Sequence, residues 1–97
     1  MSTKQPPIYV YTKDTCPFCD NAKQLLASKG LTYTEYRVDQ DDKRWQEMLE
    51  ISGRRTVPQI VIGKKSVGGF DDLFALVKTD KLKVLLEGNG QTEQQTS

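Results

Sequence analysis

The sequence predicts an α/β fold, a four-stranded mixed sheet flanked by helices in the order β-α-β-α-β-β-α-α. Short runs of β-branched and aromatic residues alternate with longer stretches whose apolar residues recur at helical spacing. Short polar or glycine-containing turns separate these stretches. A chain of 97 residues, 36% of them hydrophobic, is long enough for one domain with one modest core.

The first strand and helix are predicted from residues 8–30. The run IYVYT over residues 8–12 is typical of a short buried strand, and residues 13–16 form a loop after it. Thr15 is the expected N-cap, and Pro17 falls in the first helical turn, where its missing N–H costs little. Gly30 is the expected C′ residue. Between them, apolar residues follow the helical period at Ala22, Leu25 and Leu26.

The second strand and helix are predicted from residues 32–53. Residues 32–38 alternate in character and are rich in β-formers, which indicates a strand. The acidic run over residues 39–42 is typical of a turn and a helix start, and Ser52-Gly53 ends that helix. Its apolar face is expected to comprise Trp45, Met48, Leu49 and Ile51.

The last four elements are two strands and two helices. Residues 57–62 form the third strand, and Lys64-Lys65 connects it tightly to a short strand at Ser66-Val67. Gly68-Gly69 precedes a helix, and residues 82–86 suggest a final short one. The apolar face of the former comprises Leu73, Leu76 and Val77. The first crossover should be parallel and right-handed, and the third and fourth strands should form a hairpin.

The domain is expected over residues 8–87. Residues 1–7 are polar with two prolines, and residues 88–97 are rich in Gln, Thr and Gly with no apolar residue, so we expect a flexible N-terminal segment and a disordered tail. A net charge of +1 gives no reason to expect nucleic acid or a membrane surface as partner. No run approaches the ~20 apolar residues of a membrane span, and no secretory signal is present, so we expect a cytoplasmic protein.

Two cysteines at the start of the first helix are the strongest candidate for a functional site. Cys16 and Cys19 form a C-x-x-C, which indicates a redox-active dithiol in a cytosolic protein with a β-α-β pattern. Helix N-termini and nearby cations lower a cysteine pKa from about 8.5 to roughly 3.5–7.5. Cys16 is therefore the expected attacking thiolate, and Cys19, one turn later, is the expected resolving cysteine.

Three other interpretations of the cysteine pair are a zinc half-site, an iron–sulfur ligand pair and two unrelated core cysteines. The chain has no histidine and no further cysteine, so a zinc site would need ligands from a second copy. Core cysteines would not explain the strand–loop–helix context. The redox interpretation is favoured, and no metal site is predicted.

Three motifs together resemble those of a dithiol glutaredoxin over residues 8–87. They are CPFC at residues 16–19, TVPQ at residues 56–59 and GGFDD at residues 68–72. The resemblance implies a thioredoxin-like fold and a monomer that uses glutathione as its reducing substrate, with no tightly bound cofactor. The implied partners are glutathione and glutathionylated or disulfide-containing proteins.

The resemblance also implies a set of glutathione-binding residues. Lys13 matches the lysine for the glycyl carboxylate, and Arg44 lies where a second contact to that carboxylate is expected. Pro58 should be a cis proline, and Phe18 replaces the usual tyrosine while keeping an aromatic surface. The γ-glutamyl end belongs at residues 70–72. The implied set is Lys13, Phe18, Arg44, Thr56, Val57, Pro58, Phe70, Asp71 and Asp72.

Each of these residues also has a structural interpretation. Val57-Pro58 is compatible with a plain strand start, and Asp71 or Asp72 with a helix cap. A solvated side chain is the simpler interpretation of Arg44, and also of Arg54-Arg55, a basic cluster that could contact acidic substrates. Packing is the simpler interpretation of Trp45 and of the tyrosines at positions 9, 11, 33 and 36.

Two rival functions are compatible with the dithiol. One is a thioredoxin-like electron donor served by a flavoenzyme reductase. The other is an iron–sulfur cluster carrier in which Cys16 and glutathione hold a cluster between two protomers. Lys13 and the corner at residues 69–72 favour glutathione as reductant, and the proline after Cys16 favours redox activity over cluster carriage.

Overall fold

The computed structural model describes residues 6–87. Its elements follow the predicted order: β1 (Ile8–Thr12), α1 (Pro17–Ser28), β2 (Thr34–Arg37), α2 (Asp42–Ser52), β3 (Gln59–Ile62), β4 (Lys65–Gly68), α3 (Phe70–Lys78) and α4 (Lys81–Glu87). The predicted tail over residues 88–97 and the first five residues of the predicted N-terminal segment lie outside the described residues.

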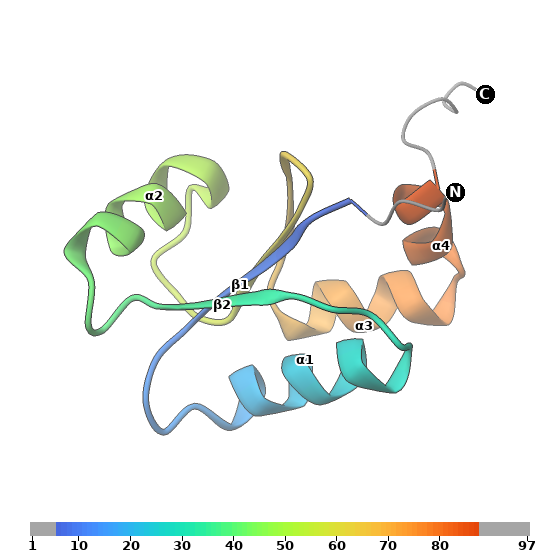
Figure 1. Ribbon diagram of the computed structural model, residues 1–97, viewed down its shortest axis with the longest axis horizontal. Coiled ribbons are helices and arrows are strands. Elements are labelled where there is room, and N and C mark those ends of the chain that lie inside the picture. The colour runs from blue at the N-terminus through green and yellow to red at the C-terminus, as the bar shows by residue number, and fades with distance from the viewer. Residues whose placement is uncertain (1–5, 88–97) are drawn as a thin grey trace.

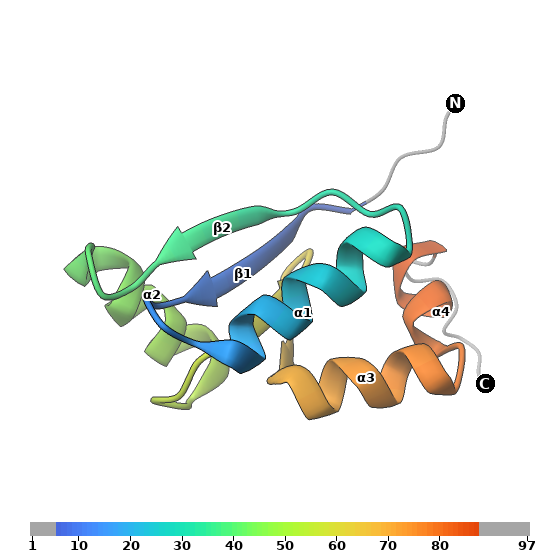
Figure 2. The ribbon, with the colours of Figure 1, turned by 90° about the horizontal axis from the view of Figure 1, so that it is seen from below.

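The four strands form one mixed sheet in the order β2-β1-β3-β4. β1 pairs in parallel with β2 and antiparallel with β3, and β3 and β4 form an antiparallel hairpin. Helices cover both faces: α1 and α3 lie together on one side of the sheet and α2 lies on the other (Figures 1 and 2). The predicted α/β class, the parallel first crossover and the hairpin are therefore confirmed.

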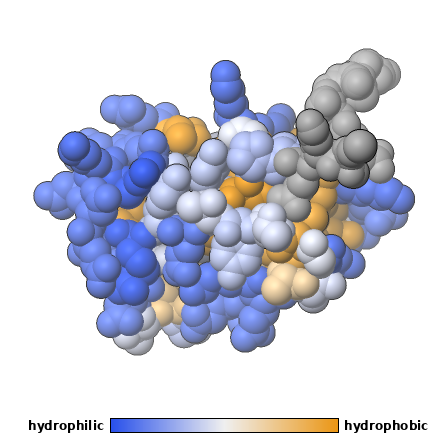
Figure 3. Space-filling view, viewed as in Figure 1, coloured by the Kyte–Doolittle hydropathy of each residue, from blue (hydrophilic) through white to orange (hydrophobic). Residues whose placement is uncertain are grey.

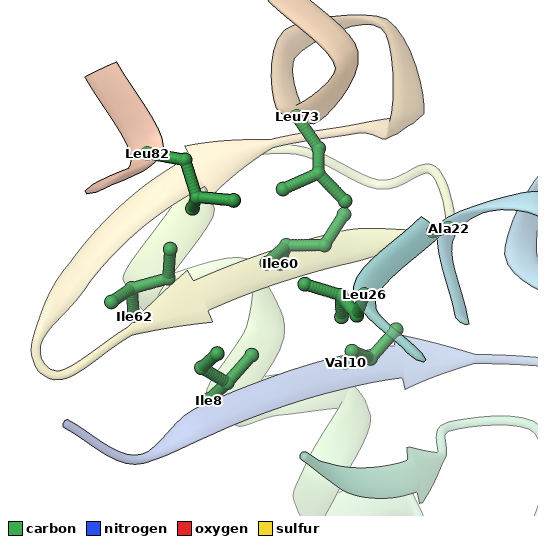
Figure 4. Close-up of a cluster of buried hydrophobic side chains, with 8 residues drawn as sticks. All are labelled: Ile8, Val10, Ala22, Leu26, Ile60, Ile62, Leu73 and Leu82. Carbon is green, nitrogen blue, oxygen red and sulfur yellow. The ribbon is translucent and has the colours of Figure 1, made fainter. Parts of the chain in front are cut away.

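The core divides between the two faces because neighbouring strand residues point to opposite sides. Between the sheet and α1, α3 and α4 lie Ile8, Val10, Ala22, Leu26, Ile60, Ile62, Leu73 and Leu82, which converge in Figure 4. Under α2 lie Tyr11, Val38, Met48 and Val61, with Trp45 packed against them. β1 thus contributes Ile8 and Val10 to one cluster and Tyr11 to the other.

Hydrophilic residues cover most of the face seen in Figure 3, and hydrophobic residues come to the surface mainly near the middle and towards α4. A shallow apolar pocket lies at the end of α1, lined by Lys29, Leu31, Val77, Asp80, Leu82, Lys83 and Leu86. Among residues 6–87, no helix is both long and apolar enough to cross a membrane.

Several element boundaries differ from the prediction. β2 is shorter than residues 32–38, and β3 begins at Gln59 rather than residue 57, because a proline cannot donate to the strand ladder. The hairpin turn is Gly63-Lys64 rather than Lys64-Lys65. Gly63 has a φ of 65°, the positive value that the first position of this two-residue turn requires. Ile51, expected on the apolar face of α2, is 41% exposed.

Candidate active site

The first helix begins one residue later than predicted. Cys16, not Thr15, is the N-cap of α1, with φ −129° and ψ 95°. The cause is Pro17 at the first helical position, because a residue before proline is held in the extended region. Thr15 instead has a φ of 52° in the left-handed region. The capping atom is therefore the Cys16 sulfur itself.

Cys16 and Cys19 are joined as a disulfide, with their Cα atoms 5.2 Å apart. The Cys19 backbone N–H donates to Cys16 Sγ over 3.1 Å. In the reduced state, such a donor at a helix N-terminus favours the thiolate of Cys16 over its thiol. Cys19 is 1% exposed and Cys16 is 8% exposed, so Cys16 is the more accessible of the two sulfur-bearing residues.

The loop before Cys16 is tied to the segment that follows β2. The backbone N–H of Asp14 donates to Asp39 Oδ2 over 3.1 Å, and Arg37 donates to both oxygens of Asp39 over 3.0 and 2.9 Å. The bond to Arg37 lowers the pKa of Asp39 to about 2, so its carboxylate stays charged at neutral pH. The ion pair thus positions the loop that carries Lys13, whose side chain is exposed.

A pocket of about 210 Å³ lies beside the start of α1. Phe18, two residues after Cys16, is one of its walls, and the start of α3 is another. The pocket is lined by Phe18, Arg54, Thr56, Val57, Pro58, Gln59, Gly69, Phe70, Asp71 and Asp72. Seven of the nine residues predicted to bind glutathione are therefore brought together, although they come from three separate segments of the chain.

The TVPQ segment forms the floor of this pocket. The Val57–Pro58 peptide bond is cis, as the resemblance implies. Val57 lies before the start of β3. Within residues 6–87, its backbone N–H and C=O make no hydrogen bond in a turn, loop or helix cap, so they are available to a ligand. Gln59 Nε2 donates to the carbonyl and the hydroxyl of Thr56 over 3.0 and 3.3 Å, so the side chain of Gln59 stabilises this turn.

The two aspartates at the start of α3 have different roles. Asp72 Oδ2 accepts from the Gly69 N–H over 3.0 Å and from Arg54 Nη1 over 3.2 Å, so Asp72 is a helix cap and an ion-pair partner. Asp71 is exposed in the pocket wall. The first N–H groups of a helix have no partner within that helix, so this corner can accept a carboxylate beside Asp71.

Arg54 is a pocket residue that the sequence argument did not select, since a solvated loop was the preferred interpretation of Arg54-Arg55. Two features of the sequence could have indicated it: Arg54 lies just before the TVPQ motif, and an acidic motif, GGFDD, follows further along the chain. In the structure, Arg54 forms an ion pair with Asp72 of that acidic motif.

Two predicted residues are not brought to this pocket. Lys13 is not among its lining residues. Arg44 lines a different pocket, its guanidinium 3.7 Å from the centre of the Tyr36 ring and 2.9 Å from Glu47 Oε1. Tyr36 packs against Tyr9 and Tyr11 in the same region. The glutathione contacts of Lys13 and Arg44 stay predictions, and the tyrosines pack as expected.

Replacing Gly68 by alanine is expected to destabilise this corner. Gly68 has a φ of 119°, and a Cβ there would lie 2.7 Å from the Asp72 carboxyl carbon. Backbone strain of this kind costs about 1–3 kcal/mol, and displacing Asp72 also removes the cap of α3. Urea denaturation should show a lower free energy of unfolding for Gly68→Ala.

Gly63→Ala is the matched control for this substitution. Gly63 also has a positive φ, 65°, but an added Cβ would meet no atom within 4 Å. The control therefore carries the cost of a positive φ, at a smaller angle than at Gly68, without the clash. An equal loss of unfolding free energy in the two variants would show that Asp72 does not constrain position 68.

The glutaredoxin family model matches residues 8–67. The chain is similar to glutaredoxin 3 of Escherichia coli K12, with 46% identity over 82% of this chain and 96% of the relative. It is similar to a glutaredoxin of Pseudomonas aeruginosa, with 46% identity over 84% and 96% of the two chains.

Two solved structures resemble this fold. The solution structure of a Brucella melitensis glutaredoxin gives a TM-score of 0.76 and 42% identity, over 90% of this chain and 95% of that one. The crystal structure of a buckwheat glutaredoxin–glutathione complex gives a TM-score of 0.75 and 32% identity, over 84% of this chain and 76% of that one.

Proposed function

Because the chain belongs to the glutaredoxin family, and is a thiol–disulfide oxidoreductase whose redox pair is Cys16 and Cys19, we propose that glutathione is its reductant. Its proposed substrates are protein–glutathione mixed disulfides and protein disulfides. The observation that carries the proposal is the pocket beside the dithiol, which collects the TVPQ and GGFDD motifs. The buckwheat relative, solved in complex with glutathione, supports it.

The proposed binding mode follows from the chemistry of the pocket. The α-carboxylate of the γ-glutamyl residue is bound by the N–H groups at the start of α3, and its ammonium by Asp71. The free backbone groups of Val57 pair with the cysteinyl residue as a neighbouring strand would. Phe18 covers the tripeptide, and Lys13 reaches the glycyl carboxylate. Asp72 supports the site indirectly, by capping α3.

The proposed reaction with a mixed disulfide has two exchange steps. The Cys16 thiolate attacks the glutathione sulfur, a Cys16–glutathione disulfide forms, and the substrate protein leaves as a thiolate that takes up a proton. A second glutathione thiolate then attacks the glutathione sulfur bound to Cys16. Oxidised glutathione leaves, and the Cys16 thiolate is restored.

Protein disulfides need the second cysteine. After Cys16 attacks, the Cys19 thiolate displaces the substrate and closes the Cys16–Cys19 disulfide, the state seen in the structure. Two glutathione molecules then reduce it. We propose that this cycle takes place in the cytoplasm. We also propose that the protein acts as a monomer, because one chain supplies both the dithiol and the pocket.

A coupled assay tests the choice of reductant. With hydroxyethyl disulfide, glutathione, glutathione reductase and NADPH, the protein should support steady NADPH oxidation. With thioredoxin reductase in place of glutathione and its reductase, oxidation should stay at the background rate. Turnover that depends on thioredoxin reductase alone would overturn the proposal and favour the thioredoxin-like alternative.

A pair of variants in the same assay tests the binding mode. Asp71→Asn should raise the KM for glutathione about 5- to 10-fold, the size expected for a partly solvated charge-assisted hydrogen bond. Asp42→Asn is the matched control, because Asp42 occupies the first turn of α2 as Asp71 occupies that of α3. An equal change of KM in both variants would contradict a direct contact between Asp71 and glutathione.

A further inference from the structure

Large apolar side chains are exposed on the surface next to the pocket. Phe18 is 59% exposed and Phe74 is 44% exposed. Phe70 lies between them, with its ring centre 6.2 Å from that of Phe18 and 5.8 Å from that of Phe74. Lys78 continues the line, with Nζ 5.4 Å from the centre of the Phe74 ring. We call these four residues the aromatic row.

The aromatic row begins in the pocket and leaves it along α3. Phe18 and Phe70 are pocket walls, whereas Phe74 and Lys78 are not among the lining residues. Residues 70, 74 and 78 are four positions apart and therefore share one face of the helix. From residue 70 to residue 78 the helix rises about 12 Å. α1 and α3 lie side by side, so the row spans both helices (Figure 2).

Packing within the protein does not explain the outer half of the row. Phe70 packs against the buried cluster under the sheet, but Phe74 leaves nearly half of its surface in water. An exposed apolar surface beside a reactive group is typical of a site where a partner binds. Because the row is continuous with the pocket proposed for glutathione, its occupant is a molecule that extends beyond that pocket.

We propose that the aromatic row docks the polypeptide whose cysteine Cys16 releases, with an apolar side chain over Phe74 and a carboxylate at Lys78. The inference rests on the proposed function. In a mixed disulfide the glutathione half fills the pocket, so the residues flanking the substrate cysteine must lie on the surface that borders it. The row is an exposed apolar part of that border.

The charges along α3 give the docked segment a direction. The pocket end of the row carries Asp71 and Asp72, and Asp72 is already paired with Arg54. The far end carries the exposed cation Lys78. A helix dipole also favours this charge order, but it does not account for the exposed phenyl rings. The row therefore matches a segment in which the acidic residue lies further from the modified cysteine than the apolar residue does.

Two glutathionylated peptides provide the test. One carries leucine and then glutamate on the same side of the modified cysteine, and the other carries serine at both positions. The wild-type protein should turn over the Leu/Glu peptide with a kcat/KM about 5- to 10-fold higher. Phe74→Ser should remove this preference while leaving turnover of hydroxyethyl disulfide unchanged. Serine and phenylalanine have similar helix propensities, so α3 should persist.

Ile51→Ser is the matched control, since Ile51 is a 41% exposed apolar residue on α2, across the sheet. It should leave both peptide rates unchanged. Lys78→Glu adds a charge reversal, and it should shift the preference from the Leu/Glu peptide to a Leu/Lys peptide.

The outcomes separate the two proposals. Normal turnover of hydroxyethyl disulfide with no peptide preference would overturn the docking role of the aromatic row alone. If Phe74→Ser lost as much turnover of hydroxyethyl disulfide as of the Leu/Glu peptide, the docking role of the aromatic row would also be overturned. If the wild-type protein does not turn over hydroxyethyl disulfide with glutathione, the proposed function fails first.

Discussion

Cys16→Ser is expected to lose at least about 1,000-fold in kcat/KM for mixed disulfides, as enzymes do when they lose their nucleophile. An alcohol does not ionise near neutral pH, and only the thiolate of a cysteine attacks a disulfide. The substitution separates the chemistry of Cys16 from its structural role, because Cys16 is also the N-cap of α1 and accepts the Cys19 N–H. Serine is a preferred N-cap residue, so the helix start is kept while the chemistry is removed.

Cys16→Ala separates the two roles of this residue. Alanine removes the nucleophile and the cap together, so it should be as inactive as serine but less stable by about 1 kcal/mol. Hydroxyethyl disulfide turnover and urea denaturation of both variants provide the two readouts. Substantial activity in the folded serine variant would mean that Cys16 is not the attacking residue, and Cys19 would then have to be reassigned.

The order and type of the elements could be predicted because the period of the apolar residues differs between strands and helices. Ile8 and Val10 alternate with the tyrosines, whereas Ala22 and Leu26 are one helical turn apart. The predicted boundaries of the helices and strands were less accurate where the backbone preference of one residue overrode a general capping or strand signal. Thr15 is a good N-cap by composition, but Pro17 restricts Cys16 to the extended region and moves the cap to it.

Residues that meet only through the fold were harder to place. The TVPQ and GGFDD motifs could be assigned to one site from their resemblance to a family, not from their spacing. The division of labour between Asp71 and Asp72 depends on which carboxylate reaches the Gly69 N–H, a detail of three-dimensional geometry. Arg54 lines the pocket and pairs with Asp72 of α3, a contact between segments 18 residues apart that only the fold reveals. Phe74 lies in no motif, so only its exposure and its stacking with Phe70 single it out.

Cys19→Ser is expected to split the activity by substrate. Turnover of protein–glutathione mixed disulfides should stay within about twofold of the wild type, because neither exchange step uses the second thiol. The donor to Cys16 Sγ is the backbone N–H of residue 19, which serine retains. Reduction of a protein disulfide should fall on the order of 100-fold, since the first mixed disulfide has no internal resolving thiol.

The two assays must use the same preparation of the Cys19→Ser variant. Residue 19 is 1% exposed in the wild-type protein, and a buried hydroxyl without a partner lowers stability. A misfolded variant would lose both activities together, whereas a missing resolving thiol removes only one of them. Equal losses in a variant that unfolds at the wild-type urea concentration would contradict the unequal roles of the two cysteines. Retention of both activities would show that glutathione alone resolves every intermediate, and that Cys19 serves only the packing of α1.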